Sequence, residues 1–158
     1  MNKKMHLYIL GIVLGLLSVN TSCKKSEKEI ETEYLTTAVG QAKVDSDIQW
    51  VVVLPGLGCH GCIQEGEAFM RDHIENKEIL FVLTNISSLK ILQQKIGIKI
   101  EEHPNVYVDR ENIFNIPTDN SIYPCIIQMK NDKIANHEFQ SPKNGAAFRK
   151  LKDLVLAR

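Results

Sequence analysis

Short continuous apolar runs alternate along this chain with stretches whose apolar positions recur at helical spacing. A continuous run bounded by turn residues is typical of a buried strand, whereas a repeat of three to four residues is typical of an amphipathic helix. The expected strands are 48–54, 79–83 and 106–108. The expected helices are 62–74 and 88–96. Ser87 or Ser88 is expected to cap the second helix and Gly97 to end it, while Gly66 indicates close packing or a kink in the first.

The last third of the chain has the pattern of a β-hairpin followed by a helix. Apolar runs at 122–129 and 134–139 flank a turn at 130–133. Ser141 and Pro142 are expected to provide the N-cap and first position of the final helix. Its apolar face would contain Phe148, Leu151, Leu154 and Val155. The predicted order is therefore β-α-β-α-β-β-β-α, and the segment 34–43 adds either an edge strand or a helical turn.

The N-terminal segment has the features of an export signal. Lys3 and Lys4 precede an apolar run of 13 residues at 7–19, which is too short for an ordinary membrane span. The run ends in small residues before Cys23, an arrangement that resembles a bacterial lipobox, although Asn20 stands where leucine is usual. This resemblance implies that Cys23 is lipidated and becomes the mature N-terminus. The alternatives are an ordinary signal peptide or a membrane anchor, with Cys23 incidental.

Removal of residues 1–22 leaves 136 of the 158 residues, the length of one domain, with a formal net charge of −2. This balance gives no electrostatic basis for nucleic-acid binding. The charged stretch 24–33 predicts a tether, so we expect a lipid-anchored tether at 23–45 and a monomeric folded domain at 46–158.

The strongest chemical signal is Cys59-His60-Gly61-Cys62, which follows the first predicted buried strand and opens a predicted helix. A helix N-terminus carries unpaired N–H groups and positive potential, which favour the nucleophilic thiolate over the thiol. The spacing also allows the second sulfur to attack a mixed disulfide formed on the first. A purely structural disulfide would close a very small loop and would constrain the unfolded chain weakly.

This arrangement resembles the thioredoxin fold over residues 48–158, and it is most similar to the TlpA-like, membrane-tethered envelope thiol–disulfide oxidoreductases. The matches are the cysteine pair, Glu65 three residues after the second cysteine, and Pro124 before a strand and turn. The resemblance implies an α/β, thioredoxin-like three-layer fold, in which helices flank a mixed central sheet. The chain departs from the family at Gly58, where tryptophan is common, and has Val53 in place of the buried aspartate of classical thioredoxin. Gly61 also replaces the usual proline.

The resemblance implies roles for the residues around the cysteine pair. Cys59 would be the nucleophile and Cys62 the more buried resolving thiol. Glu65 would accept the proton of Cys62, unless it is an ordinary exposed helical glutamate. His60, if protonated, would stabilise the Cys59 thiolate and make the disulfide more oxidising, unless it is a solvent-facing loop residue.

A second group of implied roles lies near Pro124. The resemblance implies a cis peptide bond before Pro124 and a Tyr123 backbone that pairs with substrate. The alternative is a trans proline that opens an edge strand. Cys125 either fills the core or joins Cys59 and Cys62, with or without His60, as a ligand of zinc, copper(I) or an iron–sulfur cluster.

Together these features predict a lipid-anchored enzyme of the bacterial periplasm that exchanges disulfides with protein thiols or disulfides of the envelope. A further, unidentified redox partner would restore its Cys59–Cys62 pair. No metal or organic cofactor is expected, because the disulfide itself carries the electrons. The alternatives are a metal carrier or metal-site assembly factor that uses Cys59, Cys62 and Cys125, and a non-catalytic thioredoxin-like interaction domain.

Overall fold

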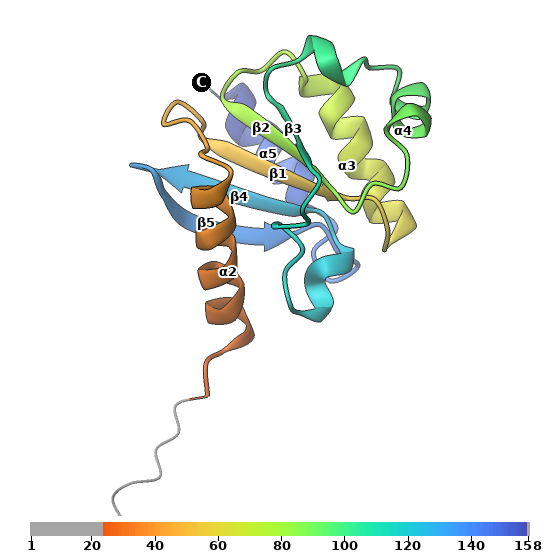
Figure 1. Ribbon diagram of the computed structural model, residues 1–158. Coiled ribbons are helices and arrows are strands. Elements are labelled where there is room, and N and C mark those ends of the chain that lie inside the picture. The colour runs from red at the N-terminus through yellow and green to blue at the C-terminus, as the bar shows by residue number, and fades with distance from the viewer. Residues whose placement is uncertain (1–23, 158) are drawn as a thin grey trace, which may run out of the picture.

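A five-stranded mixed sheet forms the centre of the molecule, with helices on both faces (Figure 1). The computed structural model describes residues 24–157. The strands are β1 (Trp50–Pro55), β2 (Ile79–Thr84), β3 (Val106–Asp109), β4 (Cys125–Lys130) and β5 (Lys133–Phe139). Their spatial order is β3-β2-β1-β4-β5, in which β1, β2 and β3 are parallel and both β4 and β5 pair in antiparallel fashion.

Four α-helices flank the sheet, and two short 3-10 helices lie in the connections. The α-helices are α2 (Glu27–Gln41), α3 (His60–His73), α4 (Leu89–Ile96) and α5 (Ala147–Leu156). The 3-10 helices are η1 (Ile100–Glu102) and η2 (Asp119–Ile122). From β1 onward the order of strands and α-helices is the one predicted. The α/β fold class is therefore confirmed, and the mixed, helix-flanked sheet is compatible with a thioredoxin-like fold.

The two faces of the sheet bury separate hydrophobic clusters, because successive side chains of a strand point to opposite faces. On β1, Val52 belongs to the cluster beneath α3, α4 and α5, whereas Val51 and Val53 belong to the cluster that α2 covers. Helices α3 and α4 share a face because both right-handed crossovers step the sheet in the same direction, from β1 to β2 to β3. This packing leaves the loop after β1 and the first turn of α3 at the edge of the domain.

Several local predictions are confirmed. Ser88 caps α4 by accepting a hydrogen bond from the Ile91 N–H, and Gly97 ends the helix with φ of 72°. The hairpin turn has positive φ at both Asn131 and Asp132, as a two-residue type I′ turn requires. At Gly66, a Cβ would lie 2.5 Å from a Leu54 methyl group, so the glycine permits close packing of α3 on β1.

The predicted start of the last helix is wrong. Helix α5 begins at Ala147, because Ser141 pairs with Asn144 in an isolated bridge instead of capping a helix. The Asn144 side chain also donates to the Glu138 carboxylate and to the Phe139 carbonyl, which holds this loop against the end of β5. On α5 itself Leu151 is buried as expected, but Leu154 is about half exposed.

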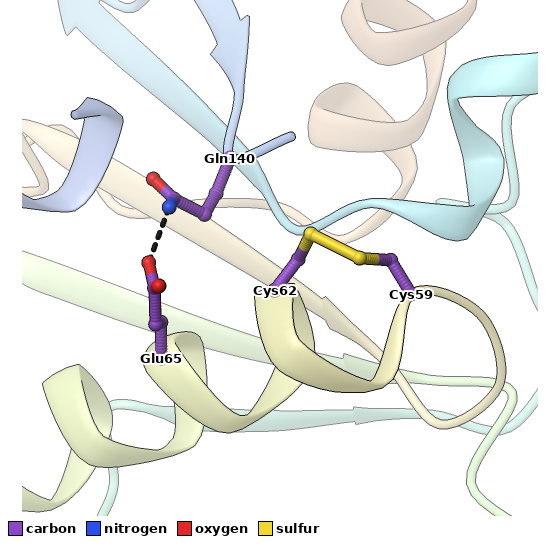
Figure 2. The surroundings of a disulfide bond; sticks show 4 residues. All are labelled: Cys59, Cys62, Glu65 and Gln140. Atoms are coloured by element: carbon purple, nitrogen blue, oxygen red, sulfur yellow. Dashed lines mark hydrogen bonds between the residues drawn. A yellow bond between two sulfur atoms is a disulfide. The ribbon is translucent and has the colours of Figure 1, made fainter. Parts of the chain in front are cut away.

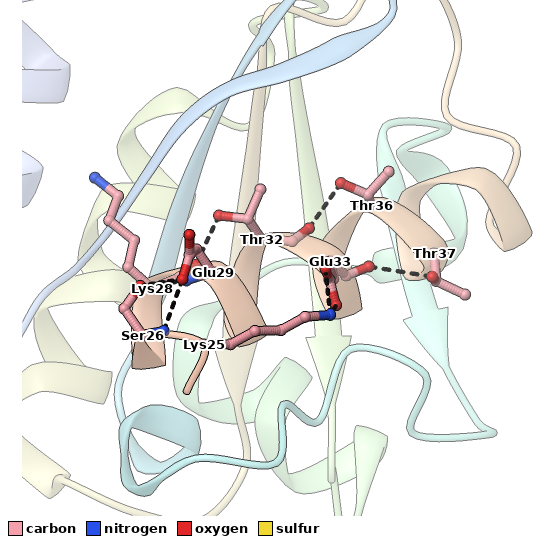
Figure 3. Close-up of polar contacts among 8 residues, drawn as sticks. All are labelled: Lys25, Ser26, Lys28, Glu29, Thr32, Glu33, Thr36 and Thr37. Atoms are coloured by element: carbon pink, nitrogen blue, oxygen red, sulfur yellow. Dashed lines mark hydrogen bonds and ion pairs between the residues drawn. The ribbon is translucent and has the colours of Figure 1, made fainter. Parts of the chain in front are cut away.

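The segment predicted as a tether is instead a helix from Glu27 onward. Ser26 and Glu29 form a capping box, in which the Ser26 hydroxyl accepts from the Glu29 N–H and the Glu29 carboxylate accepts from the Ser26 N–H. Figure 3 shows the outer side of α2, where Lys25 pairs with Glu33 and threonine hydroxyls donate to carbonyls one turn back. These contacts stabilise a helix that has few large apolar side chains.

The inner side of α2 is part of the folded domain. Leu35, Ala38 and Val39 are buried in the cluster on that face of the sheet, and Glu31 is buried beside them. The folded unit therefore begins before residue 46, which corrects the predicted boundary. The predicted signal peptide at 1–22 and the lipidation site Cys23 lie outside the described residues. Within 24–157, none of the helices is long and apolar enough to cross a bilayer.

Candidate functional site

The cysteine pair lies where β1 leaves the sheet and α3 begins. Cys59 is the N-cap of α3, and the two sulfur atoms lie at disulfide-bonding distance with the Cα atoms 5.3 Å apart (Figure 2). Cys59 is half-buried, whereas Cys62, one turn into the helix, is 8% exposed. This is the order of exposure predicted for a nucleophile and a resolving thiol. His60 is the first residue of α3 and is exposed, and its tuning role stays a prediction.

The loop before Cys59 fits tightly against the segment that precedes β4. Gly58 has φ of 145°, a conformation that residues with a Cβ rarely adopt, and a Cβ there would overlap the Ile122 backbone. The next residue continues this contact, because the Cys59 N–H donates to the Ile122 carbonyl at 3.0 Å. The residue that contacts the cysteine loop is therefore Ile122, whereas the resemblance pointed to Tyr123 and Pro124.

The peptide bond between Tyr123 and Pro124 is trans, which corrects the predicted cis bond. Tyr123 has the extended conformation that a following proline favours, with φ of −110° and ψ of 145°. The Tyr123 N–H donates to the Asn120 carbonyl at 3.0 Å. It is therefore occupied within η2, and only the Tyr123 carbonyl is left for the predicted pairing with substrate.

Glu65 lies on the exposed side of α3 and accepts a hydrogen bond from the side-chain amide of Gln140 (Figure 2). Gln140 is 2% exposed and joins three parts of the fold. Its backbone N–H donates to the Pro124 carbonyl at 2.9 Å, and its side-chain oxygen accepts from the Phe148 N–H at 3.2 Å. Gln140 thereby links the start of β4 to α3 and α5, a role that no local sequence pattern indicates.

Cys125 is a core residue on the opposite face of the sheet from α3. It is 4% exposed, pairs in register with Val53, and belongs to the hydrophobic cluster covered by α2. Burial, reinforced by the carboxylates of Glu31 and Glu138, raises the pKa of this thiol well above its ordinary value. Such a thiol stays protonated and unreactive at neutral pH. Among residues 24–157, no group of three histidine, cysteine or acidic side chains is placed to hold a metal ion.

A pocket of about 190 Å³ lies beside the cysteine-bearing helix, between α3 and α4. Its walls are mostly apolar, with Ile63 from α3 and the exposed Ile91 from α4. Glu67 also lines it and is 8% exposed, and its carboxylate pairs with the Lys95 ammonium at 2.6 Å. The buried carboxylate of α3 is therefore Glu67, whereas the sequence resemblance drew attention to Glu65.

A second buried polar group joins α2, η2 and β5. The Glu31 carboxylate accepts from Thr118 and Asn120 on one oxygen and contacts His137 on the other. None of these residues stands out in the sequence, because glutamate is usually exposed and the partners of Glu31 come from distant segments of the chain. This network reaches the cysteine pair through η2.

No family model matches the chain, and searches of the curated proteins and of the solved structures gave no match. The evidence for function therefore comes from the geometry of the cysteine pair and its surroundings.

Proposed function

We propose that this protein is a thiol–disulfide oxidoreductase that uses Cys59 and Cys62 to exchange disulfides with other proteins. The observation that carries the proposal is the placement of the pair: a partly exposed cysteine at the N-cap of α3 and a buried one a turn later, at bonding distance. The N–H groups of the first turn stabilise a Cys59 thiolate, which is the reactive species.

The reaction proceeds through a mixed disulfide. In the reducing direction, the Cys59 thiolate attacks one sulfur of a substrate disulfide, and the other substrate sulfur leaves as a thiolate. The Cys62 thiolate then attacks the Cys59 sulfur, which re-forms the Cys59–Cys62 disulfide and releases the second substrate thiolate. Two electrons pass to the substrate, and a partner dithiol then supplies two electrons that reduce the Cys59–Cys62 disulfide again. The oxidising direction is the same sequence in reverse.

The surface around Cys59 suits a protein substrate. Leu57 is 68% exposed in the loop before the pair, and Ile122, whose carbonyl holds the Cys59 N–H, is 44% exposed. Both side chains are available to contact apolar groups of a protein substrate that approaches Cys59. One carboxylate oxygen of Glu65 accepts from the Gln140 amide, and the role of Glu65 as acceptor of the Cys62 proton stays a prediction.

The decisive experiment compares three cysteine variants in insulin reduction and in oxidation of a reduced model protein. Cys59→Ser is expected to abolish exchange, and Cys62→Ser is expected to accumulate mixed disulfides because the resolving thiol is gone. Cys125→Ala is the matched control, since it removes a buried thiol on the other face of the sheet. Full activity of Cys59→Ser, or loss of exchange in Cys125→Ala alone, would contradict the assignment.

We also propose that lipid on Cys23 holds the protein at the periplasmic side of a bacterial membrane. The support is the short apolar run that ends in Thr-Ser-Cys. Mass spectrometry of the mature N-terminus is expected to show diacylglyceryl on Cys23, and Cys23→Ser is expected to release the protein or leave its precursor uncleaved. An unmodified Cys23 in the mature protein would remove the anchor.

Metal analysis of protein purified under reducing conditions tests the alternative of a metal carrier.

A further inference from the structure

We propose that Glu31 is a positioning residue for Cys59, which it holds in place through η2. This inference rests on the proposed function, in which Cys59 is the nucleophile. Glu31 lies on α2, in the part of the chain predicted as a tether, and it does not contact the cysteine pair itself. Its effect passes through two sets of hydrogen bonds, one from Glu31 to η2 and one from η2 to Cys59.

The first set joins Glu31 to the start of η2. Its side chain is 4% exposed, and its Oε1 accepts from the Thr118 hydroxyl and from the Asn120 amide, each at 2.8 Å. Its Oε2 lies 2.9 Å from Nε2 of His137, whose side chain is 3% exposed. Each carboxylate oxygen therefore has a partner, as a buried charge requires.

The second set joins η2 to the nucleophile. The Asn120 carbonyl accepts from the Tyr123 N–H, which fixes the turn that presents the Ile122 carbonyl. That carbonyl accepts from the Cys59 N–H, and the adjacent Gly58 lies so close to Ile122 that no Cβ fits between them. Because this contact leaves no free space, displacement of η2 is transmitted to Cys59.

The packing of α2 on the sheet does not depend on the hydrogen bonds from Thr118 and Asn120 to Glu31. The helix is already held to the sheet by Leu35, Ala38 and Val39, and by the bond from Lys28 to Asn136 on β5. An apolar residue at position 31 would bury its side chain on this face without desolvating a charge. The carboxylate adds a specific attachment for η2, which carries the carbonyl that Cys59 requires.

The test detaches η2 from Glu31 and leaves the pairing of Glu31 with His137 intact. The double variant Thr118→Val/Asn120→Ala removes both donors and keeps the Asn120 carbonyl. The matched control is Asn136→Ala, which removes an α2–β5 hydrogen bond that does not involve η2. The conservative variant Glu31→Gln retains an oxygen for Thr118 and Asn120 and an amide that can donate to a neutral His137.

The first readout is amide hydrogen exchange in the oxidised protein, followed by NMR. In the double variant the Cys59 and Tyr123 amides are expected to exchange about tenfold faster, the effect of losing roughly one hydrogen bond. The Val52 amide in the core of β1 is expected to be unchanged, which separates positioning from global destabilisation. Asn136→Ala and Glu31→Gln are expected to stay close to wild type.

The second readout is the pH profile of Cys59 alkylation by iodoacetamide in the reduced protein. A Cys59 that is no longer fixed at the helix N-terminus forms its thiolate less readily, so the profile is expected to move to higher pH in the double variant. Unchanged amide exchange together with an unchanged pH profile of alkylation would overturn the proposal. Glu31 would then only stabilise the packing of α2 on the domain. Failure of wild-type protein to exchange any protein disulfide would instead refute the proposed function, while the amide measurement would still report on positioning.

Discussion

Replacement of Leu35 by alanine tests most directly whether α2 belongs to the folded domain. Leu35 is fully buried between α2 and the sheet, in the cluster that contains Val51, Phe114 and Ile127. The change removes three carbon atoms, worth about 2.4 kcal/mol at roughly 0.8 kcal/mol each. A residual cavity adds to this cost, so the free energy of unfolding is expected to fall by about 3 kcal/mol, within the roughly 2–5 kcal/mol range of buried leucine truncations.

Urea denaturation followed by circular dichroism measures this loss, and the thermal midpoint is expected to fall by about 10 °C. Thr37→Ala, on the exposed side of the same helix, is the control and is expected to change stability by less than about 0.5 kcal/mol. A residue in a tether would behave like this control. A loss below about 1 kcal/mol for Leu35→Ala would therefore refute the conclusion that α2 is packed on the sheet.

Three further predictions concern the interior and the site. Gly66→Ala is expected to destabilise the protein by about 1–3 kcal/mol in urea denaturation, because its Cβ would press on Leu54 and Phe148; no loss would show that α3 can shift. Burial alone would raise the pKa of Glu31, but hydrogen bonds from His137, Asn120 and Thr118 and the attraction of His137 hold it below its ordinary value. Its stabilising contribution is therefore present above the unfolded pKa of about 4.3 and lost as pH falls through the lower folded value. Stability measured across that range is expected to lose part of its acid dependence in Glu31→Gln, and an unchanged slope would contradict this. His60→Ala is expected to raise the Cys59 pKa and make the disulfide less oxidising in glutathione equilibration, where a tenfold shift corresponds to about 30 mV; an unchanged potential would place His60 among the solvated residues.

The strands and helices from β1 onward were predictable because their side chains follow a regular period. Continuous valine-rich runs such as Val51–Val53 have few alternatives to a buried strand, and Ser88 and Gly97 mark the ends of α4 by local chemistry. The cysteine pair was predictable for a different reason. Its spacing and its position after a predicted strand are both visible in the sequence.

The remaining features depend on contacts between distant parts of the chain. Helix α2 was not predicted because few apolar residues lie on its buried side, and Glu31 is among the buried residues. The partners of the Glu31 carboxylate come from η2 and β5. The cis bond at Pro124 was expected by resemblance, but the bond before a proline can adopt either isomer, and the local sequence does not determine which one forms. The linking role of Gln140 could not be predicted from the sequence, because its three hydrogen-bond partners lie at α3, at the start of β4 and on α5.

The start of α2 at Glu27 fixes how close the folded domain would lie to a membrane if Cys23 were lipidated. If Cys23 carries lipid as proposed, the chain between it and Glu27 spans at most about 14 Å when fully extended. The first half of α2 is also the half that contacts η2, through Glu31, and the Ile122 carbonyl of η2 in turn accepts from the Cys59 N–H. If both the lipid anchor and the redox role hold as proposed, Cys59 would be kept near the membrane, and its protein partners would be expected to carry their cysteines close to that surface.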